Sequence, residues 1–469
     1  MALSHVLLSV ALFAVLSFRI IVDWSKLRKA PGPVLAGFTD LWRAYQQYNG
    51  RMREKLLDLH ARHGPIVRYG VRCISISDPE VINIVYGSRA GFVTADSYKV
   101  LLGYHNGKDI PSLVSTRDEK QHGALRRSVA NAFTPTAVLD YEKWIDMTIR
   151  ELLESVARKQ TFDLTSMILW YTMDAAARFS FGTSLGCLSA EDDVGGSIQL
   201  IRDRFRHWGL WSSYPAIERL VYRNSFFKPA KRAPSSIASV ASARLKERIS
   251  NDRGAKEGKD TSATPDLLQR FLEASNEFPQ ALDGPGIVGM LMSTISGAAD
   301  TTASTAVVML FYLLKNPEVL RKLEAELADA GIQEIPAFAE VGKLPYLNAV
   351  LRESMRVFTI GTFPNGAARA VHLNKTVFGE DSDVFRPERW LTDDREQLRL
   401  MEAAHVGFSR GRRSCLGQNI AVLSIKKVIP ALITKFKLSL VDPDASLEAD
   451  CAPAAVILEP IYVKSKIRV

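Results

Sequence analysis

Ten residues near the C-terminal end, 408–417, place one cysteine in a basic loop with a glycine on either side. Gly411 and Gly417 allow the tight backbone and the close approach to a flat ligand that a Cβ would hinder. Three neighbouring arginines, at positions 410, 412 and 413, favour the thiolate form of Cys415, which is the metal-binding form. The helix-compatible run that begins at Ile420 places the sulfur just before a helix N-terminus, where the dipole also favours negative charge. The alternative is a buried structural cysteine in a surface loop, because a free cysteine usually behaves as a small hydrophobe.

The whole pattern resembles the haem-ligand loop of the cytochromes P450, Phe-x-x-Gly-x-Arg-x-Cys-x-Gly. Every fixed position is matched, by Phe408, Gly411, Arg413, Cys415 and Gly417. The resemblance implies that Cys415 is the axial ligand of the iron in haem b (iron protoporphyrin IX), and that the other four residues line this cofactor. Thiolate ligation in this family is an established way to push electron density toward O–O cleavage.

The first 23 residues predict a membrane anchor, because the run is apolar apart from a few small polar residues, one histidine and Arg19 and is long enough to span a bilayer. A cleaved signal peptide is the alternative, but the run lacks a basic n-region and a small-residue cleavage site. Basic residues at positions 26, 28 and 29 predict that the rest of the chain lies in the cytosol. Residues 24–50 then form a basic, proline-rich hinge, and residues 51–469 form the catalytic domain.

Length and composition limit the domain organisation and the classes of function that the chain can have. The chain of 469 residues has no linker that divides it into halves, which predicts one large multi-lobed domain. Its four cysteines are far apart and lack C-x-x-C spacing, which argues against a zinc site or a disulfide framework. The net charge of +9 suits an anionic membrane surface or an acidic protein partner, and a dispersed solvated surface is the alternative. No nucleic-acid motif accompanies this charge, so no nucleic-acid partner is expected.

A long apolar helix is predicted over residues 285–314, and polar side chains enter it at Asp300 and Thr301. A carboxylate in an apolar run is costly unless it is paired, solvated or used in proton transfer. The threonine can hydrogen-bond the preceding turn. Packing alone is the alternative, but the stretch resembles the family's oxygen-activation motif, with Ala298 in place of the usual second glycine. The resemblance implies that Asp300 and Thr301 organise water and relay protons.

His122 and Arg126 lie four residues apart, on one face of a predicted helix. Two such donors could clamp a haem propionate, and a solvated basic face is the alternative. The corresponding family helix normally carries Trp-x-x-x-Arg. His122 replaces the tryptophan, a variation typical of fungal members, and residues 114–120 also resemble fungal microsomal pisatin-demethylase-like enzymes.

A structural network is predicted from Glu353, Arg356 and Arg389. The first two lie three apart in a predicted helix over residues 347–357, and the third belongs to a Pro-Glu-Arg-Trp segment similar to the family's Pro-Glu-Arg-Phe. Between these motifs, over residues 363–372, the chain lacks the sequence of a β-hairpin that family members carry. This loss would shorten one wall of the substrate pocket, and it leaves open whether Arg369 contacts a propionate.

The resemblance therefore implies a mainly α fold with small β-sheets (α+β), in which haem lies between the long central helix and the helix after the cysteine loop. The expected reaction inserts one atom of O₂ into an apolar small molecule by hydroxylation, O-demethylation or epoxidation, in fungal secondary metabolism or detoxification. Electrons are expected from NADPH through NADPH-cytochrome P450 reductase, with cytochrome b5 as an optional second donor, because no flavin or dinucleotide fingerprint is present. The expected location is the endoplasmic reticulum membrane, with a single span. The alternatives are a haem protein without turnover, impaired by the shortened 363–372 region, and a non-haem membrane protein whose cysteine is structural.

Overall fold

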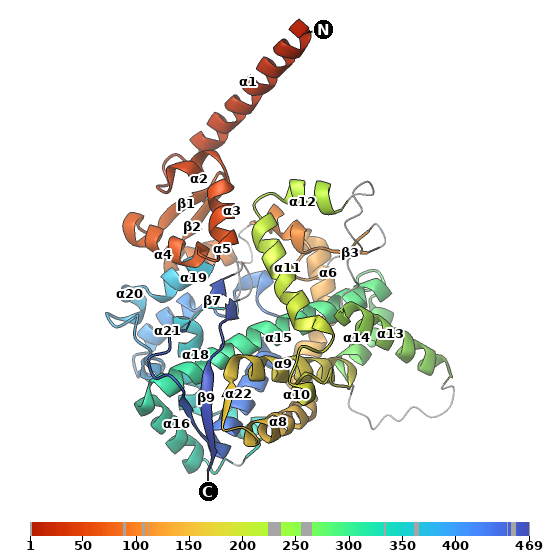
Figure 1. Cartoon of the computed structure of the whole chain (residues 1–469), viewed down its shortest axis with the longest axis vertical. Coiled ribbons are helices and arrows are strands. Elements are labelled where there is room, and N and C mark those ends of the chain that lie inside the picture. The colour runs from red at the N-terminus through yellow and green to blue at the C-terminus, as the bar shows by residue number, and fades with distance from the viewer. Residues whose placement is uncertain are drawn as a thin grey trace.

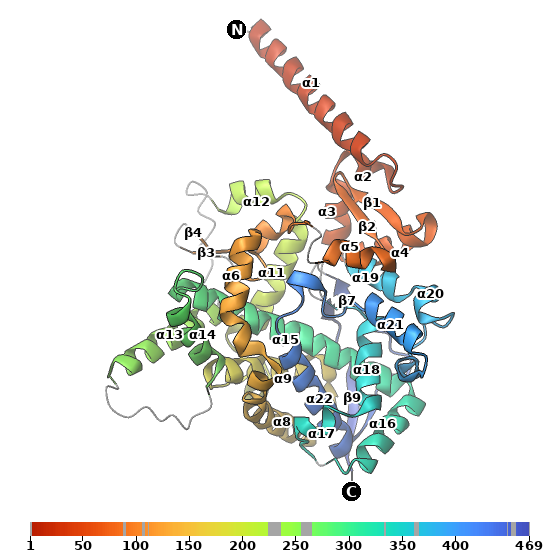
Figure 2. The ribbon, with the colours of Figure 1, turned by 180° about the vertical axis from the view of Figure 1, so that it is seen from behind.

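The computed structural model describes residues 2–87, 91–105, 108–110, 112–223, 236–254, 265–332, 334–360, 365–447, 449–451 and 456–468. The architecture is mainly helical with small antiparallel sheets, which confirms the predicted class (Figure 1). The long helix α15 (Gly284–Lys315) crosses the middle of the body, and α9 (Leu164–Phe181) and α22 (Gln418–Lys435) pack against it (Figure 2).

The main core lies where α15 and α9 meet α8 (Glu142–Ala157), α18 (Pro345–Val357) and α22. α9 is buried on nearly all sides, as expected for a helix that is apolar on every face. Its N-terminus is capped by the Asp163 carboxylate, which accepts hydrogen bonds from the backbone N–H groups of Thr165 and Ser166. The central helix is thus held in a rigid, well-packed frame.

The other helices surround this frame. The α-helices are α5 (Ile82–Tyr86), α6 (Glu119–Val129), α7 (Pro135–Leu139), α10 (Cys187–Ala190), α11 (Ser197–Trp211), α12 (Pro215–Tyr222), α13 (Ser236–Gly254), α14 (Leu267–Glu277), α16 (Pro317–Asp329), α17 (Phe338–Val341), α20 (Lys375–Phe378) and α21 (Arg395–Ala404). The 3-10 helices are η1 (Pro79–Val81), η2 (Asp96–Leu101), η3 (Ala130–Phe133), η4 (Val194–Gly196), η5 (Pro387–Leu391) and η6 (Gly411–Arg413).

Four small antiparallel sheets complete the described part of the chain. Two short runs rich in β-branched residues, 66–69 and 73–77, are joined through Gly70, which predicts a strand pair. The structure confirms it as β1 (Ile66–Gly70) and β2 (Cys73–Ile76). The three-stranded sheet has the order β5-β9-β6 and joins the C-terminal end to the core. The remaining strands are β3 (Gly103–His105), β4 (Lys108–Ile110), β5 (Thr161–Asp163), β6 (Phe436–Leu440), β7 (Ala449–Cys451), β8 (Val456–Leu458) and β9 (Tyr462–Ile467).

Residues 88–118 show no sustained periodicity and contain several glycines, which predicts a long loop. The described part of this segment carries more structure than a loop, because η2 and the paired strands β3 and β4 lie within it. Trp208 on α11 packs on Val100 and Leu101 of η2, and its indole N–H donates to the Ser97 carbonyl at 2.9 Å. This tryptophan is therefore core packing. Trp208 belongs to an aromatic-rich stretch over residues 205–227, for which the family resemblance implies a mobile roof over the pocket and core packing is the alternative. Residues 224–227 of this stretch lie outside the described residues.

The region of the missing hairpin contains a helix, α19 (Asn365–His372), which packs on α4 (Met52–His63). Figure 1 shows this contact directly below the β1–β2 sheet, which has two strands in the described part of the chain. Phe363 and Pro364 lie outside the described residues. Within the described residues, the next element after α18 is thus a helix that packs against α4.

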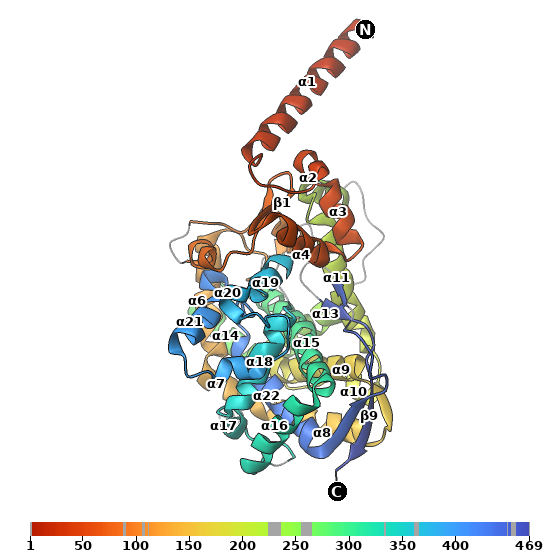
Figure 3. The ribbon, with the colours of Figure 1, turned by 90° about the vertical axis from the view of Figure 1, so that its left-hand side faces the viewer.

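The N-terminal helix α1 (Ala2–Lys26) projects away from the body in all three ribbon views (Figure 3). By length and composition it could cross a membrane, with a mean hydropathy of 2.3 and none of its apolar window buried. The helix extends past residue 23, and the segment predicted as a hinge carries α2 (Val34–Phe38) and α3 (Leu41–Tyr48). α15 also has suitable length and apolarity, but it is the buried central helix.

Candidate functional site

Cys415 lies in the short loop between η6 and α22. Its backbone N–H donates to the Phe408 carbonyl at 2.9 Å, which closes the loop. Gly411 has a φ of +65°, and a Cβ there would lie 1.9 Å from the Tyr86 carbonyl oxygen, so only glycine fits. A Cβ at Gly417 would meet no other atom within 4 Å. Gly411 therefore seats the loop against the protein, whereas Gly417 leaves open space beside the cysteine.

The electrostatics around Cys415 differ from the prediction. The residue is exposed, and desolvation by the protein around the loop raises the pKa of its thiol. The Gly417 backbone N–H and the charge of Arg126 act in the opposite direction. Arg410 and Arg412 donate instead to carbonyl oxygens elsewhere. The prediction that the loop's own arginines favour the thiolate was wrong, because their guanidinium groups are directed to other partners.

The predicted pair on α6 lies beside the cysteine loop. Arg126 donates from Nη1 to the Ser414 carbonyl at 2.8 Å and from Nη2 to the Ser414 hydroxyl at 3.2 Å. His122 is buried, and this burial together with the charge of Arg413 lowers the pKa of its imidazole to about 4. His122 is therefore neutral at physiological pH and can donate one hydrogen bond.

Arg413 reaches from the loop back to α6. Its Nη2 lies 2.6 Å from the Glu119 carboxylate, and its Nη1 donates to the Leu113 carbonyl at 3.2 Å, while its Nε has no partner. Sequence reasoning missed Glu119. The available signal was its position three residues before His122, which places both on one helix face. The structure thus brings His122, Arg126 and Arg413 together around the loop.

α15 carries the other candidate residues and continues as a helix across residues 297–302. The Thr301 hydroxyl donates to the Gly297 carbonyl at 2.6 Å, the local bond expected from its sequence position. A Cβ at Gly297 would meet no other atom within 4 Å, so there is space beside this turn. Ala298, the residue that replaces the usual glycine, is only half-buried and packs on the core.

Asp300 is 4% exposed, and its Oδ2 has no hydrogen-bond partner. Burial raises the pKa of this carboxyl to about 6, and the charge of Arg202 on α11 lowers it. Arg202 is half-buried, and its Nε also lacks a partner. Sequence reasoning missed Arg202, since no motif marks it. The acid is therefore poised to exchange a proton near neutral pH.

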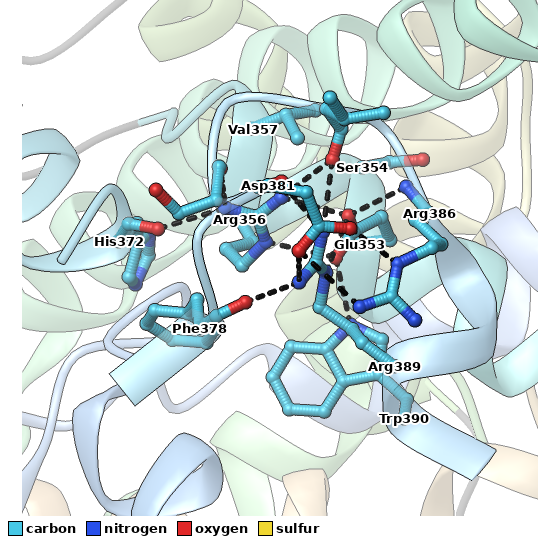
Figure 4. Close-up of polar contacts among 12 residues, drawn as sticks. Glu353, Ser354, Arg356, Val357, His372, Phe378, Asp381, Arg386, Arg389 and Trp390 are labelled. Carbon is cyan, nitrogen blue, oxygen red and sulfur yellow. Dashed lines mark hydrogen bonds and ion pairs between the residues drawn. The ribbon is translucent and has the colours of Figure 1, made fainter. Parts of the chain in front are cut away.

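Glu353, Arg356 and Arg389 form one buried cluster, as Figure 4 shows. The Glu353 carboxylate receives Arg356 Nη2 at 2.7 Å and Nε at 2.8 Å, and Arg389 Nε at 3.0 Å. The Trp390 indole N–H, at 2.9 Å, and the Arg386 backbone N–H, at 2.8 Å, complete its shell. Five donors on two oxygens satisfy the buried charge.

The two guanidinium groups are also satisfied on their other sides. Arg356 donates to the carbonyl oxygens of His372 at 2.8 Å and Val384 at 3.0 Å. Arg389 donates to the Asp381 carboxylate at 3.2 Å and the Asp381 carbonyl at 3.0 Å. The cluster therefore ties α18 to α19 and to the η5 segment.

Arg369 on α19 donates from Nη1 to the Val357 carbonyl at 2.6 Å. This carbonyl ends α18, so the contact caps that helix and links it to α19. The structure thus gives Arg369 a contact within the protein, in the region whose role the sequence left open.

The residues around Cys415 fit a flat, thiolate-ligated group. An accessible cysteine lies at the start of α22, open space adjoins Gly417 and Gly297, and α22 packs on α15. Haem, the group that the sequence resemblance implies, suits this donor set because its iron takes a cysteine ligand on one face. His122, Arg126 and Arg413 supply donors for its carboxylates.

Comparison with known proteins agrees with this geometry. The family model described as "Cytochrome P450" matches residues 34–365 and 367–465. A cytochrome P450 monooxygenase of Aspergillus terreus is 30% identical over 450 residues, which cover 89% of this chain and 91% of that protein. The cytochrome P450 monooxygenase pkfB of Emericella nidulans is 29% identical, over 95% of this chain and 92% of its own length. The longer cytochrome P450 monooxygenase mpaDE of Penicillium brevicompactum is 29% identical, over 93% of this chain and 55% of its own.

The family model thus matches residues 34–465 except residue 366, a range that includes every motif described above. These matches exclude the alternative of a non-haem membrane protein, because the family is defined by its haem iron and takes its electrons from a redox partner. The chain therefore belongs to the cytochrome P450 family and is an oxidoreductase of the monooxygenase type.

Proposed function

We propose that Cys415 is the axial ligand of haem iron, and that the enzyme inserts one atom of O₂ into an apolar small molecule by hydroxylation, O-demethylation or epoxidation. The observation that carries this proposal is the accessible cysteine, in a loop closed by the Phe408 carbonyl and fixed to α6 through Arg126. Haem bound there would supply the activation of O₂ by two electrons. The protein supplies orientation and protons.

Residues beside the cysteine loop would bind the cofactor, and residues on α15 would handle protons. Arg126, Arg413 and neutral His122 would hold the carboxylates of the bound cofactor, and Glu119, which pairs with Arg413, would offset the extra positive charge. The Thr301 hydroxyl donates its hydrogen bond to the Gly297 carbonyl. Its oxygen therefore remains free to accept a hydrogen bond from a water beside α15. Asp300, with a pKa of about 6, takes up a proton and releases it again near neutral pH. Together the last two residues hold and pass protons in the space beside Gly297.

The electrons come from NADPH through NADPH-cytochrome P450 reductase, with cytochrome b5 as an optional second donor. The absence of a flavin or dinucleotide fingerprint from the sequence supports an external donor. The apolar helix α1 anchors the enzyme by a single span in the endoplasmic reticulum membrane, with its body in the cytosol. The relatives come from filamentous fungi, which supports a role in fungal secondary metabolism or detoxification.

The test is the reduced, carbon monoxide difference spectrum of the membrane-bound protein. The unmodified enzyme should show the red-shifted Soret band of a thiolate-ligated haem. Cys415→Ser should lose that band while helix content stays unchanged, and Cys187→Ala, at a buried cysteine on α10, should keep it. A thiolate band that survives in Cys415→Ser would overturn the assignment.

A second candidate is a haem protein that is impaired in turnover. The helix α19 stands where family members are expected to carry a β-hairpin, and it packs on α4. This favours the impaired form, because a pocket wall shortened in this way would enclose a substrate less completely. The intact Glu353 cluster argues against a damaged fold. A thiolate band together with no substrate-dependent NADPH consumption, across a panel of apolar aromatic substrates, would select the impaired form.

A further inference from the structure

We propose that His372 is a positioning residue for the cysteine loop: its imidazole holds the backbone of Val406 and so fixes the turn that leads to Cys415. The proposal rests on the function proposed above, because it concerns the loop that would carry the iron ligand. His372 is the last residue of α19, the helix that occupies the region of the missing hairpin. The shortened segment would therefore contribute to the site through its last residue.

The imidazole of His372 is completely buried and bonds through both of its ring nitrogens. The Val406 backbone N–H donates to Nε2 at 3.0 Å, so this nitrogen must carry a lone pair. Nδ1 therefore carries the hydrogen and donates it to the Thr359 hydroxyl, 2.8 Å away. Burial, together with the charge of Arg356, lowers the pKa of this imidazole well below its usual value. The ring thus stays neutral and keeps one tautomer at physiological pH.

Val406 begins the turn that leads into the cysteine loop. Its carbonyl accepts a hydrogen bond from the Ser409 backbone N–H at 2.9 Å, and the Phe408 carbonyl accepts one from Cys415 at 2.9 Å. Ser409 has a φ of +56°, a left-handed conformation that is unfavourable for a residue with a Cβ. A strained turn of this kind persists only where surrounding contacts fix it. The bond from Val406 to His372 supplies such a contact.

Packed side chains hold the same turn in place. His405 stacks on the His372 ring, with centroids 5.2 Å apart and planes inclined by 14°. It also meets the Trp390 ring edge to face, with centroids 5.4 Å apart. A Cβ at Gly407 would lie 2.6 Å from the Met355 methyl group and 2.8 Å from the His405 ring. The turn therefore packs tightly against both α18 and the stacked histidines.

The backbone of His372 is in turn fixed by the buried Glu353 cluster. Arg356 donates to the His372 carbonyl at 2.8 Å, as Figure 4 shows. Trp390, which contacts His405, donates its indole N–H to Glu353 at 2.9 Å. A continuous series of contacts thus runs from the satisfied ion cluster through His372 to the cysteine loop. A rigid part of the protein, rather than the loop alone, sets the position of the turn.

Two isosteric variants separate the two hydrogen bonds of the ring. In His372→Gln, the side-chain oxygen can take the place of Nε2 and keep the acceptor for Val406. In His372→Asn, the amide can take the place of Nδ1, so that only the bond to Thr359 remains. Thr359→Val is the matched control, because it removes the bond to Nδ1 and leaves the bond to Val406 in place.

The hold on the turn is measured by residue-resolved hydrogen exchange on the full-length holoenzyme. The amides of Val406, Ser409 and Cys415 should be protected in the unmodified protein. His372→Asn should speed their exchange about tenfold or more, whereas His372→Gln and Thr359→Val should change it far less. An unprotected Val406 amide in the unmodified protein, no acceleration in His372→Asn, or equal acceleration in all three variants would overturn the proposal. If His372→Asn does not fold, the protection of Val406 in the unmodified protein and its retention in His372→Gln decide the question.

The effect on the cysteine is measured by the carbon monoxide difference spectrum of the same samples. His372→Asn should lower the share of the thiolate band several-fold, while His372→Gln and Thr359→Val should keep it. Equal losses in His372→Asn and Thr359→Val would reflect a general loss of stability and would overturn the positioning role. Hydrogen exchange does not depend on the iron ligand, so the two failures are distinct. A protein without any thiolate band would reject the proposed function, whereas a thiolate band that persists unchanged in His372→Asn would reject only the role of His372.

Discussion

The Glu353 cluster and the region around Asp300 and Cys415 both contain ionisable groups, but the two regions differ in how fully these groups are hydrogen-bonded. In the first, every oxygen of Glu353 has at least two donors, and the cluster shows no unpartnered polar atom among the described residues. In the second, Asp300 Oδ2 and Arg413 Nε have no partner, and the cysteine is exposed. Satisfied buried charge specifies structure, whereas unsatisfied charge beside open space is typical of a site that awaits a ligand or a proton.

The largest expected effect comes from breaking the satisfied cluster. Glu353→Gln leaves two guanidinium groups buried without their shared carboxylate, which should lower the free energy of unfolding by about 3–5 kcal/mol. Chemical denaturation of the full-length protein in detergent measures this loss. Glu402→Gln is the matched control, because its pair with Arg352, 2.9 Å long, is exposed on both sides and should contribute no more than about 1 kcal/mol. Equal small effects in both variants would show that the buried Glu353 cluster contributes no more to stability than an exposed ion pair does.

Local pattern was enough to predict several elements of the fold. The continuous apolar run predicted α15 over residues 285–314, within one residue of Gly284–Lys315 at each end. Gly70 between two short β-branched runs predicted β1 and β2. In both cases the determining interactions are local, so periodicity and turn chemistry carry the information.

Contacts between distant segments could not be predicted in this way. Arg126 reaches Ser414 across 288 residues, and Arg68 reaches Trp24 from another element. The loop arginines near Cys415 are close in sequence, yet a guanidinium on a long flexible stem can point several ways, and carbonyl and carboxylate partners on other segments decide which. Reasoning from their proximity in the sequence therefore overestimated how far these arginines favour the thiolate form of Cys415.

The next effect concerns the unsatisfied acid. The folded pKa of Asp300 is about 6, above the ordinary value of 3.8, so the folded state holds this proton more tightly than the unfolded state. The resulting stabilisation is complete at low pH and is lost as the pH rises from about 4 to about 6, by roughly 2–3 kcal/mol. The difference in unfolding free energy between the unmodified protein and Asp300→Asn should fall over that window and stay constant above it. A flat difference for Asp300→Asn would mean that the buried carboxyl titrates normally.

The smallest effect separates a hydroxyl used for chemistry from one used for packing. Thr301 and Thr305 both donate to the carbonyl four residues earlier on α15, at 2.6 and 2.8 Å, but only the first lies beside the open turn at Gly297, because Thr305 is buried. Thr301→Val keeps the shape and removes one hydrogen-bond acceptor, a loss of about 1 kcal/mol that should cut the yield of oxygenated product per NADPH several-fold. The diverted electrons should appear as released hydrogen peroxide, while the carbon monoxide spectrum is unchanged. Thr305→Val loses a similar bond and should keep its product yield. If both variants lost coupling equally, the effect would come from bending of α15, and Thr301 would have no separate part in proton delivery.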